Sequence, residues 1–164
     1  MSDLDTPNRD LTLLAPKFKA AVEAAITDCA SKGLDVKVNE GLRSLARQAH
    51  LFAKGRTAPG PKVTNAATNL TSWHGYGLAV DVIHKTRAFE PFGKGPGSAA
   101  KNEKWFKDVA TVFKAHSCDW GGDFSTPDSP HMQWGACPAS PTDPIKALMK
   151  TKGMKAVWTS LGAD

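Results

Sequence analysis

The sequence predicts an α+β fold, a single compact domain in which a small antiparallel sheet is flanked by helices. Apolar residues recur at spacings of three and four along several segments, which is typical of amphipathic helices. Short apolar runs between these segments suit strands. The chain has 164 residues, of which 41% are hydrophobic and 23% charged, so it can bury one core. Helices outside a few short strands favour the α+β class.

The first predicted helix covers residues 11–32. Its main part starts at Pro16, because proline suits the first helical turn, where its missing N–H does no harm. Gly33 ends this helix, since glycine readily adopts the left-handed conformation of a helix C-terminus. The alternating residues 35–39 that follow predict a short strand.

A second helix is predicted over Ser44–Lys54, with Ser44 as its N-cap and Gly55 as its end. The segment 57–71 is rich in Pro, Gly, Asn and Thr and indicates a long loop. After it, the apolar run 78–83 predicts a buried strand that carries one carboxylate.

The second half of the chain continues with a loop over residues 91–98 and a third helix over residues 99–116, which has an apolar stripe. Residues 119–130 are predicted to be a loop, and residues 131–134 a short strand. No internal repeat or domain boundary interrupts residues 1–164, and the motifs described below lie within about residues 11–135.

Residues 143–161 are amphipathic and basic, and Gly153 divides them into two predicted helices. We favour the interpretation that the apolar face of this segment closes the core while its lysines stay solvated. The alternative is that this basic segment contacts the anionic outer envelope of a bacterium. Its lysines are Lys146, Lys150, Lys152 and Lys155.

The net charge of +5 favours a polyanionic partner, namely nucleic acid, anionic lipid or an acidic wall polymer. No run of five like charges and no nucleic-acid motif occurs, so we expect no nucleic-acid partner. No apolar run approaches the ~18 residues of a membrane span, and no secretory signal is visible at the start. We therefore expect a protein that is made in the cytoplasm and stays there unless something releases it. We also expect the protein to be a monomer.

The three cysteines are odd in number and form no C-x-x-C pair, which argues against a disulfide scaffold and against a cysteine-built zinc site. Cys29 lies in a helical pattern and is predicted to be a core residue. A bond between Cys118 and Cys137 under oxidising conditions stays open as an alternative to two free thiols.

Two segments carry the residues of greatest chemical interest. In the first, His74 lies in a glycine-containing turn seven residues before Asp81, which interrupts an otherwise apolar strand. A buried carboxylate needs a cation, a metal or strong donors, and a salt bridge to lysine or backbone hydrogen bonds is the alternative to a metal. In the second, Asp128 precedes His131 by three residues in a proline-pinned turn.

Together, His74, Asp81 and His131 offer two nitrogens and one oxygen, a ligand set that suits catalytic zinc with its fourth position left to water. Asp128 then lies near that water without binding the metal, which is where a general base belongs.

The two segments that contain these residues resemble the motifs of a known family. The pattern Ser72-x-His74-x-x-Gly77-x-Ala79-x-Asp81, followed by Asp128-x-x-His131, is similar to the VanY-like superfamily of zinc D-alanyl-D-alanine carboxypeptidases. The resemblance is greater to the phage L-alanyl-D-glutamate endopeptidases, a class of endolysin. It runs from about residue 11 to residue 134 and includes further ordered motifs. These are Glu40-Gly-Leu-Arg43-Ser44, Arg47-Gln48, Gly55-Arg56-Thr57, Val63-Thr-Asn65-Ala66, Trp120-Gly-Gly-Asp123-Phe and Pro130-His131.

The resemblance implies that the two histidines and Asp81 bind one zinc ion and that Asp128 is the general base. It further implies that Arg43 holds the substrate carbonyl, and makes Gln48 and Ser72 weaker candidates for substrate or supporting contacts. Trp73 and Tyr76 border these motifs and are expected to line the substrate cleft, with aromatic packing as the alternative.

The function implied is hydrolysis of the L-alanyl-D-glutamate bond in the stem peptide of bacterial peptidoglycan. Many carboxypeptidase relatives have Glu-x-x-Trp-His where this chain has Asp128-Ser-Pro-His131, and this departure favours the endopeptidase. The alternatives are a D-alanyl-D-alanine carboxypeptidase and a non-catalytic wall-binding module. As an endolysin, the protein is expected to accumulate in a host cytoplasm and reach the wall through a membrane pore.

Overall fold

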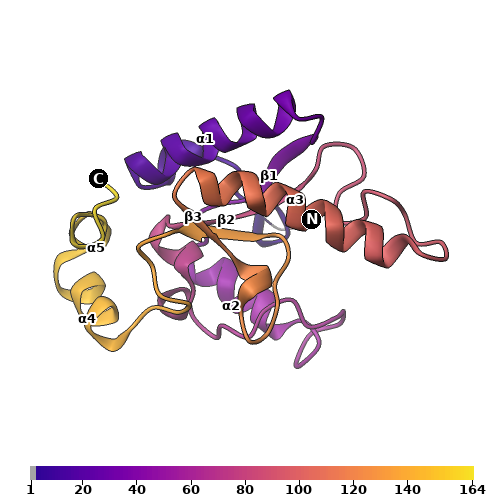
Figure 1. The fold of residues 1–164 in the computed structure, drawn as a ribbon. Helices are drawn as coiled ribbons and strands as arrows, with labels where there is room; N and C mark the ends of the chain where they lie inside the picture. Colours follow the sequence, from indigo (N-terminus) through magenta and orange to yellow (C-terminus); the bar gives the residue numbers. More distant parts are fainter. Residues whose placement is uncertain (1–2) are drawn as a thin grey trace.

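The computed structural model describes residues 3–164, which form one α+β domain around a four-stranded antiparallel sheet (Figure 1). The strand order is β1-β2-β4-β3, and every neighbouring pair is antiparallel. The predicted fold class is therefore confirmed. The strands are β1 (Val36–Glu40), β2 (Ala79–His84), β3 (Cys118–Trp120) and β4 (His131–Trp134).

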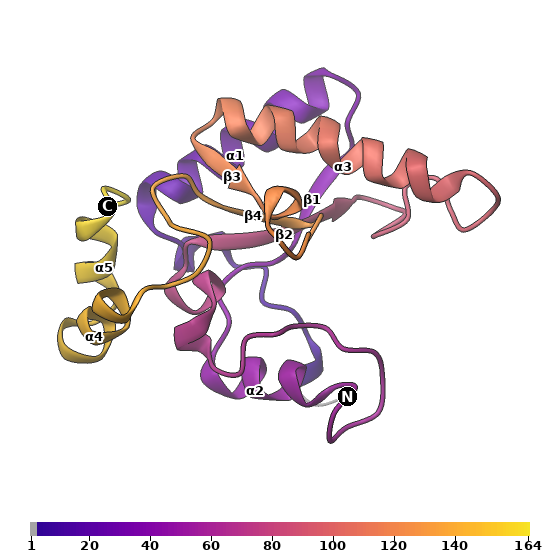
Figure 2. The same cartoon turned by 60° about the horizontal axis from the view of Figure 1, so that its bottom comes forward.

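Two long helices pack side by side against one face of the sheet, as both cartoon views show (Figures 1 and 2). These are α1 (Pro16–Ser31) and α3 (Ser98–Ala115). The helix α2 (Leu45–Ala53) lies on the opposite side of the sheet. This arrangement covers one face with apolar helices and leaves the other face to α2 and the loops that carry polar side chains.

The core forms between the helix pair and the sheet because each helix has one apolar stripe. In α1 this stripe is Phe18, Val22, Ala25 and Cys29, all fully buried, at the spacings expected for one helix face. Pro16 at the start of α1 and the left-handed Gly33 just after it confirm the predicted bounds of this helix. The buried side chains of α3 are Ser98, Trp105, Phe106, Val109, Ala110, Val112 and Phe113.

The predicted second helix and first strand also occur in the structure. Ser44 caps α2, and its hydroxyl accepts a hydrogen bond of 3.1 Å from the Arg47 backbone N–H. In β1, the register against β2 shifts between Val38 and Glu40, so that Glu40 lies opposite Asp81. This irregularity brings a second carboxylate next to the one on β2.

One local prediction is wrong. Asp119 and Trp120 were expected in a loop, but with Cys118 they form the edge strand β3, which pairs with β4. Three residues are too short to show a reliable period, and the strand exists because β4 offers a free edge to pair with. The tail behaves as predicted, since Gly153 separates α4 (Asp143–Lys152) from α5 (Met154–Ser160).

The C-terminal segment from Cys137 to Asp164 is fastened to the domain by three tryptophan indoles. Val157 and Trp158 are buried, and other apolar residues of α4 and α5 pack against the core. This agrees with the interpretation that the tail closes the core. The indole N–H bonds run from Trp73 to the Pro138 carbonyl (2.8 Å), from Trp134 to that of Leu161 (2.8 Å) and from Trp158 to that of Tyr76 (2.7 Å).

The three cysteines are all buried free thiols, so Cys29 is a core residue as predicted and Cys118 is not bonded to Cys137. Burial raises the pKa of the Cys29 thiol to about 11 and that of Cys118 to about 12. Within residues 3–164, no helix has the length and apolar character needed to cross a membrane.

Candidate active site

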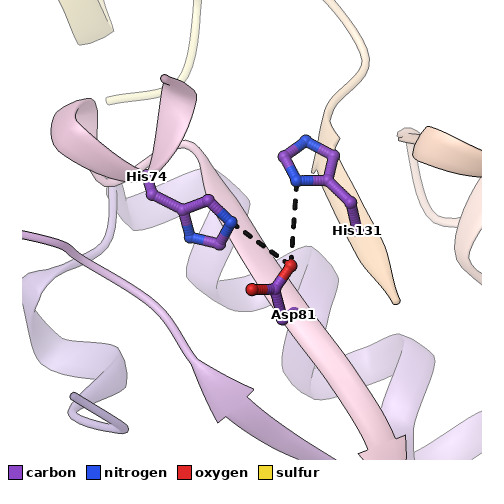
Figure 3. Close-up of side chains that lie close together, drawn as sticks. All are labelled: His74, Asp81 and His131. Carbon is purple, nitrogen blue, oxygen red and sulfur yellow. Dashed lines mark ion pairs between the residues drawn. The ribbon is translucent and has the colours of Figure 1, made fainter. Parts of the chain in front are cut away.

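Three side chains from three separate elements converge on one point beside the two central strands of the sheet, β2 and β4 (Figure 3). His74 lies in a short 3₁₀ turn, η4 (Trp73–Tyr76), Asp81 in β2 and His131 at the start of β4. Asp81 and His131 are direct partners across the antiparallel β2–β4 pair. Asp81 Oδ1 lies 3.3 Å from His74 Nε2 and 3.8 Å from His131 Nδ1.

The chain turns tightly to present His74, and two glycines make that turn possible. Gly77 ends η4 in the left-handed conformation, with φ of 66°, and leads directly into β2. A Cβ atom at Gly75 would lie 1.9 Å from the Asn69 carbonyl oxygen, so no larger residue fits there. The glycines that the sequence places around His74 therefore serve close packing of the backbone.

In both imidazoles, the ring nitrogen that points away from Asp81 makes a hydrogen bond that orients the ring. His74 Nδ1 lies 2.8 Å from the Gly41 carbonyl oxygen, and His131 Nε2 lies 2.9 Å from Gln133 Oε1. Since a carbonyl oxygen only accepts hydrogen bonds, the nitrogen facing Gly41 is the protonated one in a neutral ring. The inward nitrogens then carry lone pairs that face the Asp81 carboxylate.

The charges around the site keep Asp81 ionised and His131 neutral. Burial alone would raise the pKa of Asp81, but His74 and Arg43 outweigh it and hold that pKa well below its usual range. Burial, together with the nearby His74, lowers the pKa of His131 to about 4. At pH 7 the cluster therefore offers a carboxylate and an unprotonated imidazole.

This donor set fits a divalent cation. Two imidazole nitrogens and one carboxylate oxygen lie within 4.8 Å of one another, and acceptors at such separations repel unless a cation lies between them. Two nitrogens and one oxygen with an open side are the ligands that catalytic zinc prefers. The residues predicted to be metal ligands are thus brought together.

Arg43 lies beside this cluster, held by two carboxylates. Its Nη2 donates to Asp81 Oδ2 at 2.7 Å, and its Nε donates to Glu40 Oε2 at 2.9 Å. Glu40 also accepts from Arg47 Nε at 2.7 Å, and all three of these network side chains (Glu40, Arg43, Arg47) are buried. The Arg43 backbone N–H bonds to the His74 carbonyl at 2.9 Å, which fixes the segment after β1 to η4.

The roles of Glu40 and Arg47 in this network were missed in the sequence, although both residues lie in motifs that carry the family resemblance. The only signal was that two arginines follow Glu40 within seven residues, because Glu40 lies in β1 and Arg47 in α2 and no helical spacing relates them. Arg43 therefore orients Asp81, one of the candidate metal ligands, in addition to lining the cleft.

Asp128 lies at the mouth of the site in a loop that is held from several sides. Its backbone N–H donates to the Gly121 carbonyl at 2.9 Å, and its carbonyl accepts from the His131 N–H at 3.2 Å. Next to it, the Ser129 carbonyl accepts from the Trp120 indole at 2.7 Å. The sequence placed Asp128 near the metal ligands, and the structure does so too.

The Asp128 carboxyl is open to solvent from the cleft but poorly hydrated on its protein side. This loss of hydration, followed by repulsion from Asp81, raises the pKa of Asp128 to about 6. A carboxyl group with a raised pKa beside a neutral imidazole and an ionised carboxylate is suited to exchanging protons with a bound substrate or water.

The cluster opens into a cleft of about 860 Å³ that runs between the loops after β1, α2 and β4. Of the predicted substrate-binding residues, Ser72 and Trp73 line this cleft. Its walls also include apolar and cationic side chains that were not predicted to bind substrate. These are Val63, Phe89, Phe124, Lys62 and Lys146.

Two other predicted substrate-binding residues are not among the residues that line the cleft. Gln48 is fully buried and donates to the Ala66 carbonyl at 2.8 Å, so it fixes the loop that forms one wall. Tyr76 is also fully buried, and its hydroxyl donates to the Leu70 carbonyl at 2.9 Å. Both act on the site through the backbone that they hold.

The remaining histidines are satisfied elsewhere. His50 pairs with Asp5 at 2.8 Å and His116 with Asp28 at 3.2 Å. His84 Nδ1 accepts hydrogen bonds from backbone N–H groups in the turn that follows β2. None of the three belongs to the metal-binding cluster of residues 3–164.

Comparison with known proteins gives a consistent picture. A family model described as D-alanyl-D-alanine carboxypeptidase matches residues 65–134. The peptidoglycan L-alanyl-D-glutamate endopeptidase CwlK of Bacillus subtilis (strain 168) is 33% identical over 123 residues, covering 73% of this chain and 72% of that protein. The L-Ala D-Glu endopeptidase ChiX of Serratia marcescens has a similar fold, with a TM-score of 0.55 at 22% identity over 76% of this chain and 83% of that one.

Proposed function

Since this chain belongs to the VanY-like family of peptidoglycan-hydrolysing metallopeptidases, we propose that it is a zinc-dependent endopeptidase that cuts the L-alanyl-D-glutamate bond of the stem peptide. The observation that carries the proposal is the convergence of His74 Nε2, Asp81 Oδ1 and His131 Nδ1 beside Asp128. The specificity for this bond is supported by the relative CwlK from Bacillus subtilis, a peptidoglycan L-alanyl-D-glutamate endopeptidase that is 33% identical to this chain over 123 residues.

His74, Asp81 and His131 would hold the zinc. The chemistry that bound zinc supplies is Lewis acidity, which polarises a carbonyl group and lowers the pKa of water. Asp128 takes the proton of the attacking water and returns it to the amine that leaves.

Arg43 has two roles in this proposal. It holds Asp81 in place through Nη2, and its remaining N–H donors face the oxygen of the attacked carbonyl, where negative charge develops. The cleft also carries Lys62 and Lys146, whose ammonium groups match the acidic D-glutamyl part of the substrate. Lys62 has no ion pair within residues 3–164, so its charge is free to meet a carboxylate.

The test is to digest purified peptidoglycan with the zinc-loaded protein and weigh the products. Separation of the stem peptide after L-alanine supports the proposal. Loss of a single D-alanine would instead identify a D-alanyl-D-alanine carboxypeptidase, and binding of wall fragments without cleavage would identify a wall-binding module. The same digestion without metal, and after zinc is restored, tests the zinc requirement.

We further propose that the protein acts as an endolysin, a monomer that accumulates inside the host and reaches the wall through a membrane pore. The basic segment 143–161 has its apolar side packed on the core and its lysines exposed or half-buried, an arrangement that also suits contact with an anionic envelope. Expression in a bacterial host with and without a pore-forming protein tests the first point, since lysis should require both. Reversing the charges of Lys150, Lys152 and Lys155 should reduce activity on intact cells more than on purified wall if the envelope contact exists.

A further inference from the structure

Gln133 is a buried side chain that the proposed mechanism does not use. It lies on β4, two residues after His131, and is 1% exposed. Its Oε1 lies 2.9 Å from His131 Nε2. Its Nε2 lies 2.9 Å from the Pro138 carbonyl oxygen and 3.3 Å from that of Cys137. The amide thus joins the C-terminal segment to an imidazole of the metal cluster.

These two carbonyls determine which way the amide points. A carbonyl oxygen has no proton to donate, so only the NH₂ end of the Gln133 amide can face Cys137 and Pro138. In the flipped orientation Oε1 would face both carbonyls and two buried hydrogen bonds would be lost, which is costly for a side chain that is 1% exposed. Gln133 Oε1 must therefore face His131.

The orientation of the amide in turn determines the tautomer of His131. Because Oε1 only accepts, His131 Nε2 must carry the proton, and Nδ1 presents its lone pair to the cluster. With the amide flipped, NH₂ would face Nε2, and the ring proton would move to Nδ1, where it would occupy the metal-binding position. His74 needs no such device, since a backbone carbonyl, that of Gly41, orients it directly.

We infer that Gln133 is a positioning residue through which the C-terminal segment sets the tautomer of His131 and thereby the affinity of the site for its metal. This rests on the proposed function only in that His131 is taken as a metal ligand. The carbonyls of Cys137 and Pro138 lie beyond residues 65–134, which the family model matches. The C-terminal segment is thus part of the metal site and not only a cover for the core.

The first measurement uses the wild-type protein without metal. Nitrogen-15 NMR of the imidazoles at pH 7 should show His131 protonated at Nε2 and unprotonated at Nδ1. A ring protonated at Nδ1 overturns the inference whatever the variants do, and this result does not depend on which peptide bond the enzyme cuts.

The second measurement is the affinity for Zn²⁺, determined by competition with a chelator. Gln133→Met keeps the length of the side chain, but its thioether accepts only a weak hydrogen bond from His131. It should weaken zinc binding about 10- to 100-fold while the His131 tautomers become mixed. Gln133→Glu keeps an acceptor for His131 but loses the donors to the Cys137 and Pro138 carbonyls. It should therefore keep the Nε2–H tautomer and a higher zinc affinity than Gln133→Met, even though its thermal stability falls. Unchanged affinity and an unchanged tautomer in Gln133→Met contradict the inference.

The matched control is Trp134→Phe, which removes one hydrogen bond to the same C-terminal segment, at Leu161, without touching Gln133. Its zinc affinity should stay within about twofold of the wild type even if its thermal stability falls. If Trp134→Phe weakens zinc binding as much as Gln133→Met, the effect belongs to general docking of the segment and the specific role of Gln133 is wrong. A wild-type protein that binds no zinc would refute the proposed function, while the NMR result would still decide the role of Gln133.

Discussion

Single residues in the cleft differ in how many partners they have, and this separates chemical roles from structural ones. The Asp128 carboxylate has no side-chain hydrogen bond in the part of the chain that the structure describes, although its backbone is held on both sides. Arg43, in contrast, is held by ion pairs with both Glu40 and Asp81. A group that moves protons needs such freedom, whereas a group that positions a ligand needs fixed partners.

At Asp128 we predict that Asp128→Asn retains zinc but lowers the turnover number about 10²- to 10⁴-fold, because the amide cannot accept the proton of water. Metal analysis and peptidoglycan digestion measure the two effects. The control is Asp123→Asn in the same loop, which removes only an exposed pair with Lys114 and should leave turnover near that of the wild type. Full activity of Asp128→Asn would show that another group is the base.

At Arg43 we predict a large loss of stability on substitution by Met, because Glu40 and Asp81 keep their buried charges without a shared partner. Removing one partner of a buried ion pair lowers the free energy of unfolding by about 3–5 kcal/mol. Urea unfolding measures it. Lys104→Met, which breaks the exposed Lys104–Asp108 pair of 2.6 Å, should cost about 0–1 kcal/mol. Equal costs for the two variants would contradict a buried network.

The elements contribute by bringing distant segments together beside the central strands β2 and β4. The antiparallel pairing of β2 with β4 sets Asp81 beside His131, and the tight turn η4 places His74 just before β2. The loop between β3 and β4 doubles back so that Asp128 lies near the start of β4, and it does so through close packing at Gly121.

Substitution of Gly121 tests this packing. A Cβ atom there would lie 2.5 Å from the Asp128 carbonyl oxygen and 2.8 Å from His131 Cβ, so Gly121→Ala should displace the proposed general base and a proposed metal ligand together. We predict lower zinc affinity, lower turnover and a loss of about 1–3 kcal/mol in stability. Gly95→Ala, where the nearest atom is 3.8 Å away, is the control and should be nearly neutral. A fully active Gly121→Ala would show that this loop adjusts freely.

For the whole molecule, the proposed metal site connects η4, β2 and β4, so bound metal should stabilise the entire domain. Ligand that binds only the folded state adds about 2.7 kcal/mol at a concentration of 100 times its dissociation constant. We therefore predict that zinc raises the melting temperature and that a chelator lowers it, as scanning calorimetry will measure. His131→Ala should fold but lose this response. A response to zinc that persists in His131→Ala would indicate a different binding site.

The sequence by itself determined the local elements and the chemical types at the site. The helix bounds at Pro16 and Gly33, the N-cap at Ser44 and the break at Gly153 follow from backbone preferences of single residues, which act over short distances. The resemblance to VanY-like peptidases, carried by ordered motifs, is likewise confirmed. The residues expected to bind metal do meet, because their motifs encode turns and strands that the fold preserves.

Only the tertiary structure decided which polar side chains face the cleft and which are used to hold it together. Gln48 and Tyr76 lie in motifs that carry the family resemblance, but their side chains donate hydrogen bonds to backbone carbonyls. Glu40 and Gln133, in contrast, orient the predicted site residues Arg43 and His131. The edge strand β3 also appeared only through its pairing with β4. Burial and hydrogen bonding between segments far apart in the chain depend on where those segments pack, and no local pattern of residues carries that information.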